Sequence, residues 1–288
     1  MIEKVLDHGK VQLLGVLGND LEVVNAAKAS FDNEAVYAKE SSVTALLQKL
    51  YDNPPVQPGD AFWQEYDPKK YTQEYLRYLQ RNVTNGVGVL KPGDFKLLNF
   101  LAKHEHWSPF RHVQLKFKVK APEFIARQWW KHCVGNAYAG DGWNEMSMRY
   151  VDGSGFDFYI PNGFRLQAKN NKQCSIDETI DPNIGVLDTV CSEAVATHAK
   201  VSLDMYKNMI ASGIAKEQAR CVLPLSVYTS FVWTCSLQAL ANFIHLRNKP
   251  GAQYEIREYA DTLVKLVPYN LIASLEILVE NMDNRIKE

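Results

Sequence analysis

The chain has 288 residues, of which 46% are hydrophobic and 23% charged, and its formal net charge at pH 7 is -1. This composition excludes a disordered or collagen-like chain and indicates a globular protein with a substantial core. The chain has 32 basic and 33 acidic residues, so it lacks the excess of positive charge that is typical of nucleic-acid-binding proteins. We therefore expect no nucleic-acid partner and favour a small ligand.

The sequence shows no sign of a membrane span or a secretory signal. Its apolar runs fall far short of the roughly 18 to 20 residues that a membrane helix needs, and the N-terminal MIEKVLDHGK carries charges of both signs. The five cysteines are scattered, without CxxC or Cys/His ligand spacing. We therefore expect reduced thiols, a cytoplasmic protein without membrane contact, and no metal.

The N-terminal part of the chain predicts one strand followed by helices. The strand is expected at 11–16, and the helices at 21–31, 42–51, 71–83 and 93–104. Prolines in DNPPVQPGD separate the second helix from the third, which we expect at the surface. Asp94 is the expected cap of the fourth.

The clearest strand lies at 113–119, where apolar residues alternate with Gln and Lys. Pro122 then opens a helix that carries EFIARQWWKHC, since proline is tolerated in a first helical turn. A glycine-rich loop, VGNAYAGDGW, follows it. Strand, turn and helix together indicate a packed unit in the middle of the chain.

Helices dominate the prediction for the C-terminal half. Extended segments are expected at 144–151 and 156–160, a turn at 180–185, helices at 184–210 and 215–222, a strand at 227–235, a helix at 236–247, and two more helices after Pro250-Gly251. Because no repeat or linker interrupts the chain, we expect one α+β domain.

The densest polar cluster lies between Arg127 and Arg149. In an extended segment Glu145, Ser147 and Arg149 would share one face, and such a set could bind a phosphorylated sugar, because arginine donates two parallel hydrogen bonds to phosphate. A solvated sheet face with salt bridges is the plainer alternative.

Motifs for other chemistries are absent. GxGxxG, GxxxxGK[ST] and GxSxG do not occur. Cys133 follows His132 directly, but neighbours on a helix diverge by about 100°, which makes them poor partners for a catalytic dyad. His104, His106 and His112 lack a nearby acidic or cysteine partner for a metal.

Six stretches, in this order, resemble the flavin-dependent thymidylate synthases. They are VVNAAKASF (23–31), HWSPFRH (106–112), APEFIARQWWKH (121–132), NEMSMRY (144–150), ARCVLPLSVYTSFVWT (219–234) and NFIHLRNKPGAQYEIREYA (242–260). The resemblance implies mixed α/β protomers with a mainly antiparallel sheet flanked by long helices. It also implies a homotetramer with active sites where subunits meet, and one catalytic domain at 1–288 with inserted segments near 52–92 and 134–143.

The resemblance also assigns roles to residues. Gln128, Glu145, Ser147, Arg149 and Arg220 would bind deoxyuridine monophosphate (dUMP), and Arg247 and Lys131 would be catalytic. Ser30, His106, Ser108, His132, Asn144 and Asn242 would bind FAD. Arg247 would lie against the pyrimidine, where a fixed cation stabilises the electron-rich ring, and Ser147 would bind rather than attack.

The family signature is altered in this sequence. Where the family has Arg-His-Arg, seven residues and Ser, this chain has Lys131-His132-Cys133, thirteen residues and Ser147. The stretch TCSLQALANF carries Ser236 and Gln238 where the family usually has Asn and Arg.

The implied reaction is reductive methylation of dUMP to dTMP, with methylenetetrahydrofolate and NADPH as co-substrates and without a protein nucleophile. Two alternatives remain open. The chain could be a flavin-dependent methyl- or hydroxymethyl-transferase for another pyrimidine nucleotide, or a non-catalytic nucleotide-binding homologue that has lost flavin.

Overall fold

The computed structural model describes residues 1–44, 48, 73–134, 141–151, 153, 155–172, 174–185 and 188–285. Contacts within the chain define two compact units, each made of three segments. Unit 1 comprises Met1–Gly15, Lys116–Cys235 and Phe243–Leu266, and unit 2 comprises Val16–Leu115, Ser236–Asn242 and Val267–Glu288. The segments 52–72 and 135–140, which fall in the two expected insertions, lie outside the described residues.

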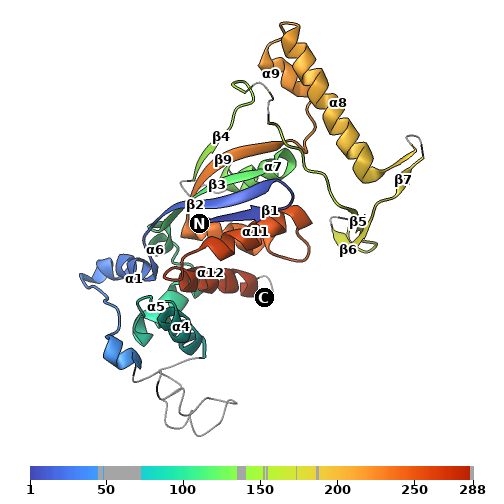
Figure 1. The fold of residues 1–288 in the computed structure, drawn as a ribbon. Coiled ribbons are helices and arrows are strands. Elements are labelled where there is room, and N and C mark those ends of the chain that lie inside the picture. The colour runs from blue at the N-terminus through green and yellow to red at the C-terminus, as the bar shows by residue number, and fades with distance from the viewer. Residues whose placement is uncertain are drawn as a thin grey trace. The chain divides into compact units, whose positions relative to one another are not determined.

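Unit 1 is built on a five-stranded sheet with the order β1-β2-β3-β9-β4 (Figure 1). The strands are β1 (Ile2–Val5), β2 (Gly9–Leu17), β3 (Gln114–Pro122), β4 (Gly142–Glu145) and β9 (Tyr228–Ser236). β1 pairs antiparallel with β2, and β4 pairs antiparallel with β9. The mixed architecture with an antiparallel sheet confirms the expected α+β class.

Apolar and polar side chains alternate along β3 and show which face of the sheet is buried. Leu115, Phe117 and Val119 are fully buried, whereas Lys116 and Lys118 are exposed. Three helices carry side chains into the core of unit 1: α7 (Glu123–Val134), the end of α10 (Leu237–Arg247) and α11 (Tyr254–Leu266). α11 contacts β1, beside which it lies in Figure 1.

Aromatic rings form the centre of that core. Trp129 of α7 stacks on Phe243 of α10 with ring centroids 4.5 Å apart and meets Trp233 of β9 edge-on at 5.3 Å. All three rings are fully buried, and each buries enough apolar surface to contribute a few kcal/mol, on the order of 3. The core therefore holds α7 and α10, the two helices that carry most of the chemistry described below.

The remaining elements of unit 1 are two hairpins and two helices (Figure 1, yellow to orange). They are β5 (Phe164–Gln167), β6 (Ser175–Ile180), β7 (Asn183–Ile184), β8 (Thr189–Val190), α8 (Cys191–Ala211), α9 (Lys216–Ala219) and the 3₁₀ turn η2 (Arg220–Val222). β5 pairs with β6 and β7 with β8, both antiparallel.

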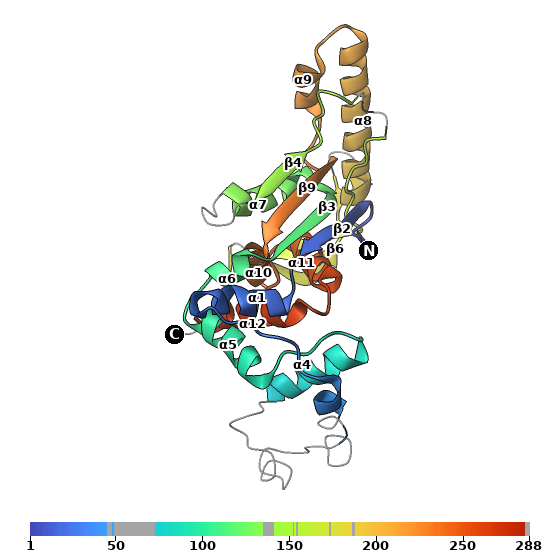
Figure 2. The same ribbon diagram turned by 90° about the vertical axis from the view of Figure 1, so that its left-hand side faces the viewer.

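Unit 2 is mostly helical. Its elements are α1 (Asp20–Lys28), the 3₁₀ turn η1 (Ala29–Phe31), α4 (Gln73–Thr84), α5 (Pro92–Lys103), α6 (Ser108–Arg111), the first part of α10, and α12 (Ile272–Arg285). α5 contacts both α1 and α12, which lie next to it in Figure 2. Lys28 of α1 pairs with Asp94 of α5 at 2.5 Å, and Asp20 accepts a 3.0 Å hydrogen bond from the backbone N–H of Ser274.

The structure corrects several element predictions. The long helix begins at Cys191 rather than at 184, because residues 183–184 pair with 189–190 as a hairpin. The strand expected at 144–151 ends at Glu145. Asp94 does not cap α5, whose N-cap is Lys91, and α4 is not a purely surface helix, since Tyr75, Tyr78 and Leu79 are buried. β1, β5 and β6 were not predicted.

Two other findings concern the described residues only. None of their helices has the length and apolar character needed to cross a membrane. Within the same residues, no group of three or more His, Cys, Asp or Glu side chains is arranged so that it could hold a metal ion.

Candidate active site

Helices α7 and α10 bring His132 and Arg247 into direct contact. Arg247 Nε donates a hydrogen bond to His132 Nε2 over 2.7 Å. A guanidinium only donates, so His132 must accept through a neutral ring that carries its proton on Nδ1. Burial, with a smaller effect of the Arg247 charge, lowers the pKa of His132 to about 4. The imidazole is therefore uncharged near neutral pH and fixes the orientation of the arginine.

Gln128 and Arg247 line the same cavity of unit 1, which has a volume of about 1070 Å³. The size is at the upper end of the roughly 300–1,000 Å³ typical of ligand pockets. Gln128 Oε1 is buried and has no hydrogen-bond partner among the residues that the structure describes. Since buried acceptors in native proteins are nearly always paired, this oxygen is suited to accept from a bound ligand.

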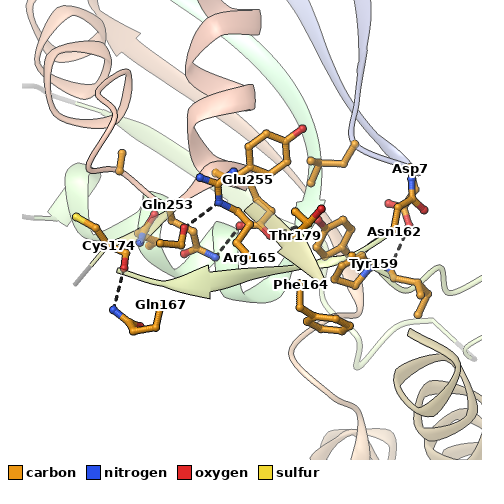
Figure 3. A pocket seen from close by; sticks show the side chains of 18 of the residues that line it. Asp7, Tyr159, Asn162, Phe164, Arg165, Gln167, Cys174, Thr179, Gln253 and Glu255 are labelled. Atoms are coloured by element: carbon orange, nitrogen blue, oxygen red, sulfur yellow. Dashed lines mark hydrogen bonds between the residues drawn. The ribbon is translucent and has the colours of Figure 1, made fainter. Parts of the chain in front are cut away.

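The other walls of the cavity come from residues to which the sequence assigned no role (Figure 3). Glu255 accepts hydrogen bonds from the Tyr159 hydroxyl at 3.2 Å and from Gln253 Nε2 at 2.9 Å. Arg165 of β5 donates from Nε to the Ser175 hydroxyl of β6 over 2.8 Å. The cavity thus has ordered polar walls, and the β5–β6 hairpin contributes one of them.

Glu145 and Arg220 both act on one half-buried carboxyl group, that of Glu123. Burial is the main cause that raises the pKa of Glu123, and the Glu145 carboxylate raises it further, while Arg127 and Arg220 oppose the shift. Glu145 ends β4, and Arg220 opens η2. Two residues of the expected nucleotide set, 75 positions apart in the sequence (220 minus 145), therefore lie in one electrostatic cluster.

Ser147 and Arg149 are arranged differently from the expectation. They were expected on one face of a strand, but they belong to a turn in which the Tyr150 N–H donates to the Ser147 carbonyl over 3.0 Å. The backbone N–H and Nε of Arg149 both donate to Ser147 Oγ over 3.3 Å. The turn replaces the alternation of a strand, so the side chains of this pair contact each other. Arg149 remains exposed.

The altered signature residues Lys131, His132 and Cys133 lie in the last turn of α7. Lys131 is exposed, whereas Cys133 is partly buried, and burial, followed by nearby Asp141, raises its pKa to about 12. Asp141 accepts from Trp233 Nε1 over 3.2 Å, and burial raises its pKa to about 6. A thiol with such a high pKa is hardly ever a thiolate, which argues against nucleophilic catalysis by Cys133.

Four of the expected FAD residues belong to unit 2. Ser30, His106 and Ser108 are exposed, and Asn242 is half-buried. The ring of His106 meets Phe100 edge-on at 5.8 Å, and the preceding Glu105 has a φ of 61°, a strained conformation for this residue type. Hydroxyl, imidazole and amide groups at accessible positions have the donor chemistry that a flavin nucleotide needs.

The two divergent positions of α10 make hydrogen bonds within unit 2. Ser236 Oγ accepts from the Ala239 N–H over 3.1 Å and so caps the helix. Gln238 Oε1 accepts from Arg111 Nε over 2.7 Å. Both residues therefore have structural partners in the protein itself.

Taken by unit, the structure joins part of the predicted set. In unit 1 it unites His132 with Arg247 and places Gln128 in the same cavity, while Glu145 and Arg220 share a second cluster. Arg149 makes its contacts within its own turn, and Asn144 is an exposed residue of β4. Sequence reasoning missed Trp143 and Thr229, which bond to Glu145; the i, i+2 spacing of Trp143 and Glu145 was the available signal.

Comparison with known proteins decides the family. The sequence model described as thymidylate synthase complementing protein matches residues 12–269 of this chain. A flavin-dependent thymidylate synthase of Thermotoga neapolitana is 30% identical over 262 residues, which cover 91% of this chain and 87% of that protein. The chain belongs to the flavin-dependent thymidylate synthase family.

Other relatives in this family align over shorter stretches. The flavin-dependent thymidylate synthase of Thermus thermophilus is 41% identical over 177 residues, or 60% of this chain and 59% of that protein. The chain thus spans about three fifths of the length of that relative.

A solved structure has the same fold as this chain. A UMP/dUMP methylase from Streptomyces cacaoi, bound with 5-Br dUMP, superimposes with a TM-score of 0.62 at 22% sequence identity, covering 96% of this chain and 97% of the other. At this identity the likeness establishes the fold, and the mixed α/β architecture expected of the family is confirmed.

Proposed function

We propose that the protein is a flavin-dependent thymidylate synthase that converts dUMP to dTMP, with methylenetetrahydrofolate as the carbon donor and NADPH as the reductant. The observation that carries this proposal is the cavity of unit 1, which is lined both by Gln128, whose buried carbonyl oxygen has no partner among the described residues, and by an arginine fixed by a neutral histidine. Membership in the family supports the assignment, and residues 1–288 act as one catalytic domain.

The nucleotide would be held by groups of complementary chemistry. Gln128 Oε1 would accept from a ring N–H or a sugar hydroxyl, and Arg247 would lie against the pyrimidine. Arg149 and Arg220 are exposed, and their planar forks suit the two terminal oxygens of a phosphate. Ser147 and Glu145 would bind the sugar or ring edge, and Lys131 would add a positive charge without a bidentate fork.

Arg247 provides the electrostatic contribution to the reaction. Its charge is permanent, and His132 fixes its Nε, so the two Nη groups keep one direction. A fixed cation beside the pyrimidine stabilises the electron-rich ring that develops as C5 attacks carbon, without reorganisation during the reaction. His132 acts here as a neutral acceptor, a role that its low pKa supports.

The residues expected to bind FAD offer suitable hydrogen-bonding groups in each unit. In unit 2, Ser30, His106, Ser108 and Asn242 would contact the flavin nucleotide, and in unit 1, His132 and Asn144 would do so. When bound, FAD supplies the hydride that completes the methyl group, and the protein contributes orientation and electrostatics. We further propose a homotetramer in which subunits meet at the active sites.

Purified protein tests this proposal directly. Incubation with dUMP, methylenetetrahydrofolate and NADPH should yield dTMP, identified by mass, and a preparation reconstituted with FAD should show a flavin spectrum. Arg247→Ala should lower kcat by roughly 100-fold or more, which is the loss typical of removing an electrostatic catalytic group. The Tm of the variant should equal that of the wild type.

The matched control is Arg77→Ala, which removes an exposed arginine of α4 and should leave turnover unchanged. Parallel reactions with UMP in place of dUMP identify a different nucleotide preference, and a hydroxymethyl product would reveal a different transfer reaction. A protein that binds nucleotide but cannot be reconstituted with FAD would contradict the proposed function.

A further inference from the structure

Two side chains hold the carboxylate of Glu145, and neither belongs to the residues assigned so far. Trp143 Nε1 donates to Glu145 Oε2 over 3.2 Å, and Thr229 Oγ1 donates to Glu145 Oε1 over 2.8 Å. Trp143 and Glu145 are two positions apart on β4, so their side chains share one face of the strand. Thr229 approaches from the neighbouring strand β9. Each carboxylate oxygen therefore has its own donor.

The indole of Trp143 is itself fixed. It stacks on Phe231 with ring centroids 3.8 Å apart and an interplanar angle of 19°, and Trp130 meets it edge-on at 5.4 Å. Phe231 is only 1% exposed, so the stacking platform belongs to the core. Contacts on the face and the edge leave the indole N–H one direction, which reduces the entropy lost when it bonds to Glu145.

The surrounding charges explain why Glu145 needs such support. The Glu123 carboxyl lies near it, as the raised pKa of Glu123 shows, and Arg127 and Arg220 act on the same group. A free Glu145 side chain would turn away from Glu123 and toward an arginine, because both movements lower the electrostatic energy. Two neutral donors hold the carboxylate in one orientation despite this pull.

We propose that Trp143 is a positioning residue that, with Thr229, orients Glu145 to accept a hydrogen bond from an O–H or N–H group of the pyrimidine nucleotide. An ionised carboxylate has about four acceptor sites, and these two bonds leave the others for a ligand. The inference rests on the proposed function, because it takes the nucleotide as the molecule that Glu145 contacts.

Trp143→Phe tests the proposal with little change in packing, since phenylalanine can still stack on Phe231 and only the N–H is lost. A hydrogen bond to a charged group is stronger than one between neutral groups, but Glu145 is exposed and solvent screens part of this contribution, so we expect the Kd and KM for the nucleotide to rise roughly 3- to 30-fold. The FAD content should stay constant and kcat should change less than KM.

Tyr269→Phe is the matched control, because it removes a polar group from an exposed aromatic ring of unit 2 and leaves Trp143 and its ring contacts in place; its nucleotide Kd should equal that of the wild type. Thr229→Val should weaken nucleotide binding as Trp143→Phe does, and Thr229→Ser should restore it. Equal affinity of Trp143→Phe and wild type for the nucleotide would overturn the positioning role.

A double-mutant cycle separates positioning from direct contact. If Trp143 acts through Glu145, Trp143→Phe should cause no further loss of nucleotide affinity in a Glu145→Ala background. Multiplicative losses would show that the indole touches the ligand itself or supports the fold, and would reject the inference.

The contact can also be read without nucleotide. In ¹⁵N-labelled protein, the indole resonance that disappears in Trp143→Phe should shift in Glu145→Ala, and an unshifted resonance would rule out the hydrogen bond. If the wild type binds no pyrimidine nucleotide, both the proposed function and this role fail, whereas normal binding by the wild type with an insensitive Trp143→Phe variant rejects the positioning role alone.

Discussion

His132 and Arg247 are separated by 115 positions, yet their side chains share one short hydrogen bond. The histidine is expected to bind FAD, and its Nε2 accepts the hydrogen bond from the arginine. Only Nδ1–H remains available to a cofactor. One imidazole thus connects the expected flavin contact with the expected catalytic cation.

His132→Leu tests the hydrogen bond between His132 and Arg247, because leucine cannot accept it. Loss of the acceptor frees the guanidinium, and since hydrogen bonds to charged groups contribute about 1.5–3 kcal/mol, we expect kcat to fall roughly 10- to 100-fold. His132→Gln, which can place an acceptor near the former Nε2, should recover part of the rate in steady-state assays. His104→Leu, at an exposed position of unit 2, is the control; equal rates for His132→Leu and wild type would contradict the assignment.

The pH dependence of this pair has a defined sign. The pKa of His132 falls from 6.5 to about 4 in the folded protein, so its stabilising contribution is complete above pH 6.5 and is lost as the pH falls through about 4. Titration of His132 should therefore not cause any fall in kcat that is measured as the pH is lowered from 7 to 5.

At the scale of elements, Asp20 connects α1 to the start of α12. It is 1% exposed. Its Oδ1 accepts from both the N–H and the hydroxyl of Ser274, and its Oδ2 has no partner within the described part of the chain. Burial raises the pKa of Asp20 from 3.8 to about 7, against the lowering effect of the Ser274 hydrogen bonds. The junction thus favours a neutral carboxyl group.

Asp20→Asn should change how stability depends on pH. The folded protein keeps the Asp20 proton after the unfolded chain has released it, so this contribution to the free energy of unfolding is complete below pH 3.8 and is lost as the pH rises through about 7. Asparagine imitates the neutral form at every pH. The Tm measured by calorimetry should therefore fall less from pH 5 to pH 8 in the variant than in the wild type, and parallel curves would exclude this role.

The elements that the sequence predicted well are those in which burial and periodicity agree. β3 alternates between core and solvent, and α7 follows a proline at its first turn, so local physics determines both. β5 and β6 could not be found in this way, because both pair only with each other and β6 is almost wholly exposed. The predicted start of α8 was wrong because a hairpin whose strands have two residues each precedes the helix and continues its apolar pattern.

The candidate site was predictable in composition and unpredictable in geometry. The resemblance identified Gln128, His132 and Arg247, but no pattern in the chain indicates that the last two touch. Ser147 and Arg149 were placed by alternation on one strand face, whereas a turn controls their positions. Trp143 carries no motif, and only the structure shows its bond to Glu145.

At the scale of the whole molecule, the exposed side of α8 bears on the proposed tetramer. Val201 is 56% exposed and Met205 50% exposed, four positions apart on one helix face, and they line a groove of about 470 Å³. Exposed apolar surface of this kind marks contacts between proteins. A second subunit would remove it from water.

Met205→Lys should therefore weaken assembly. Light scattering should give the wild type about four times the protomer mass of 32.7 kDa, and the variant a lower mass together with lower activity, because the proposed active sites lie where subunits meet. Lys207→Ser, another exposed residue of α8, is the control. An unchanged mass for Met205→Lys would place the interface elsewhere.

Each unit is closed by partners from opposite ends of the chain. Asp7 bonds to Tyr228, 221 positions later, in unit 1, and Asp20 to Ser274, 254 positions later, in unit 2. A ribosome that adds about 5–20 residues per second needs roughly 10–50 s to bridge such separations. During that interval the nascent β1–β2 hairpin and α1 lack these late partners, so neither unit can complete its packing until synthesis nears its end.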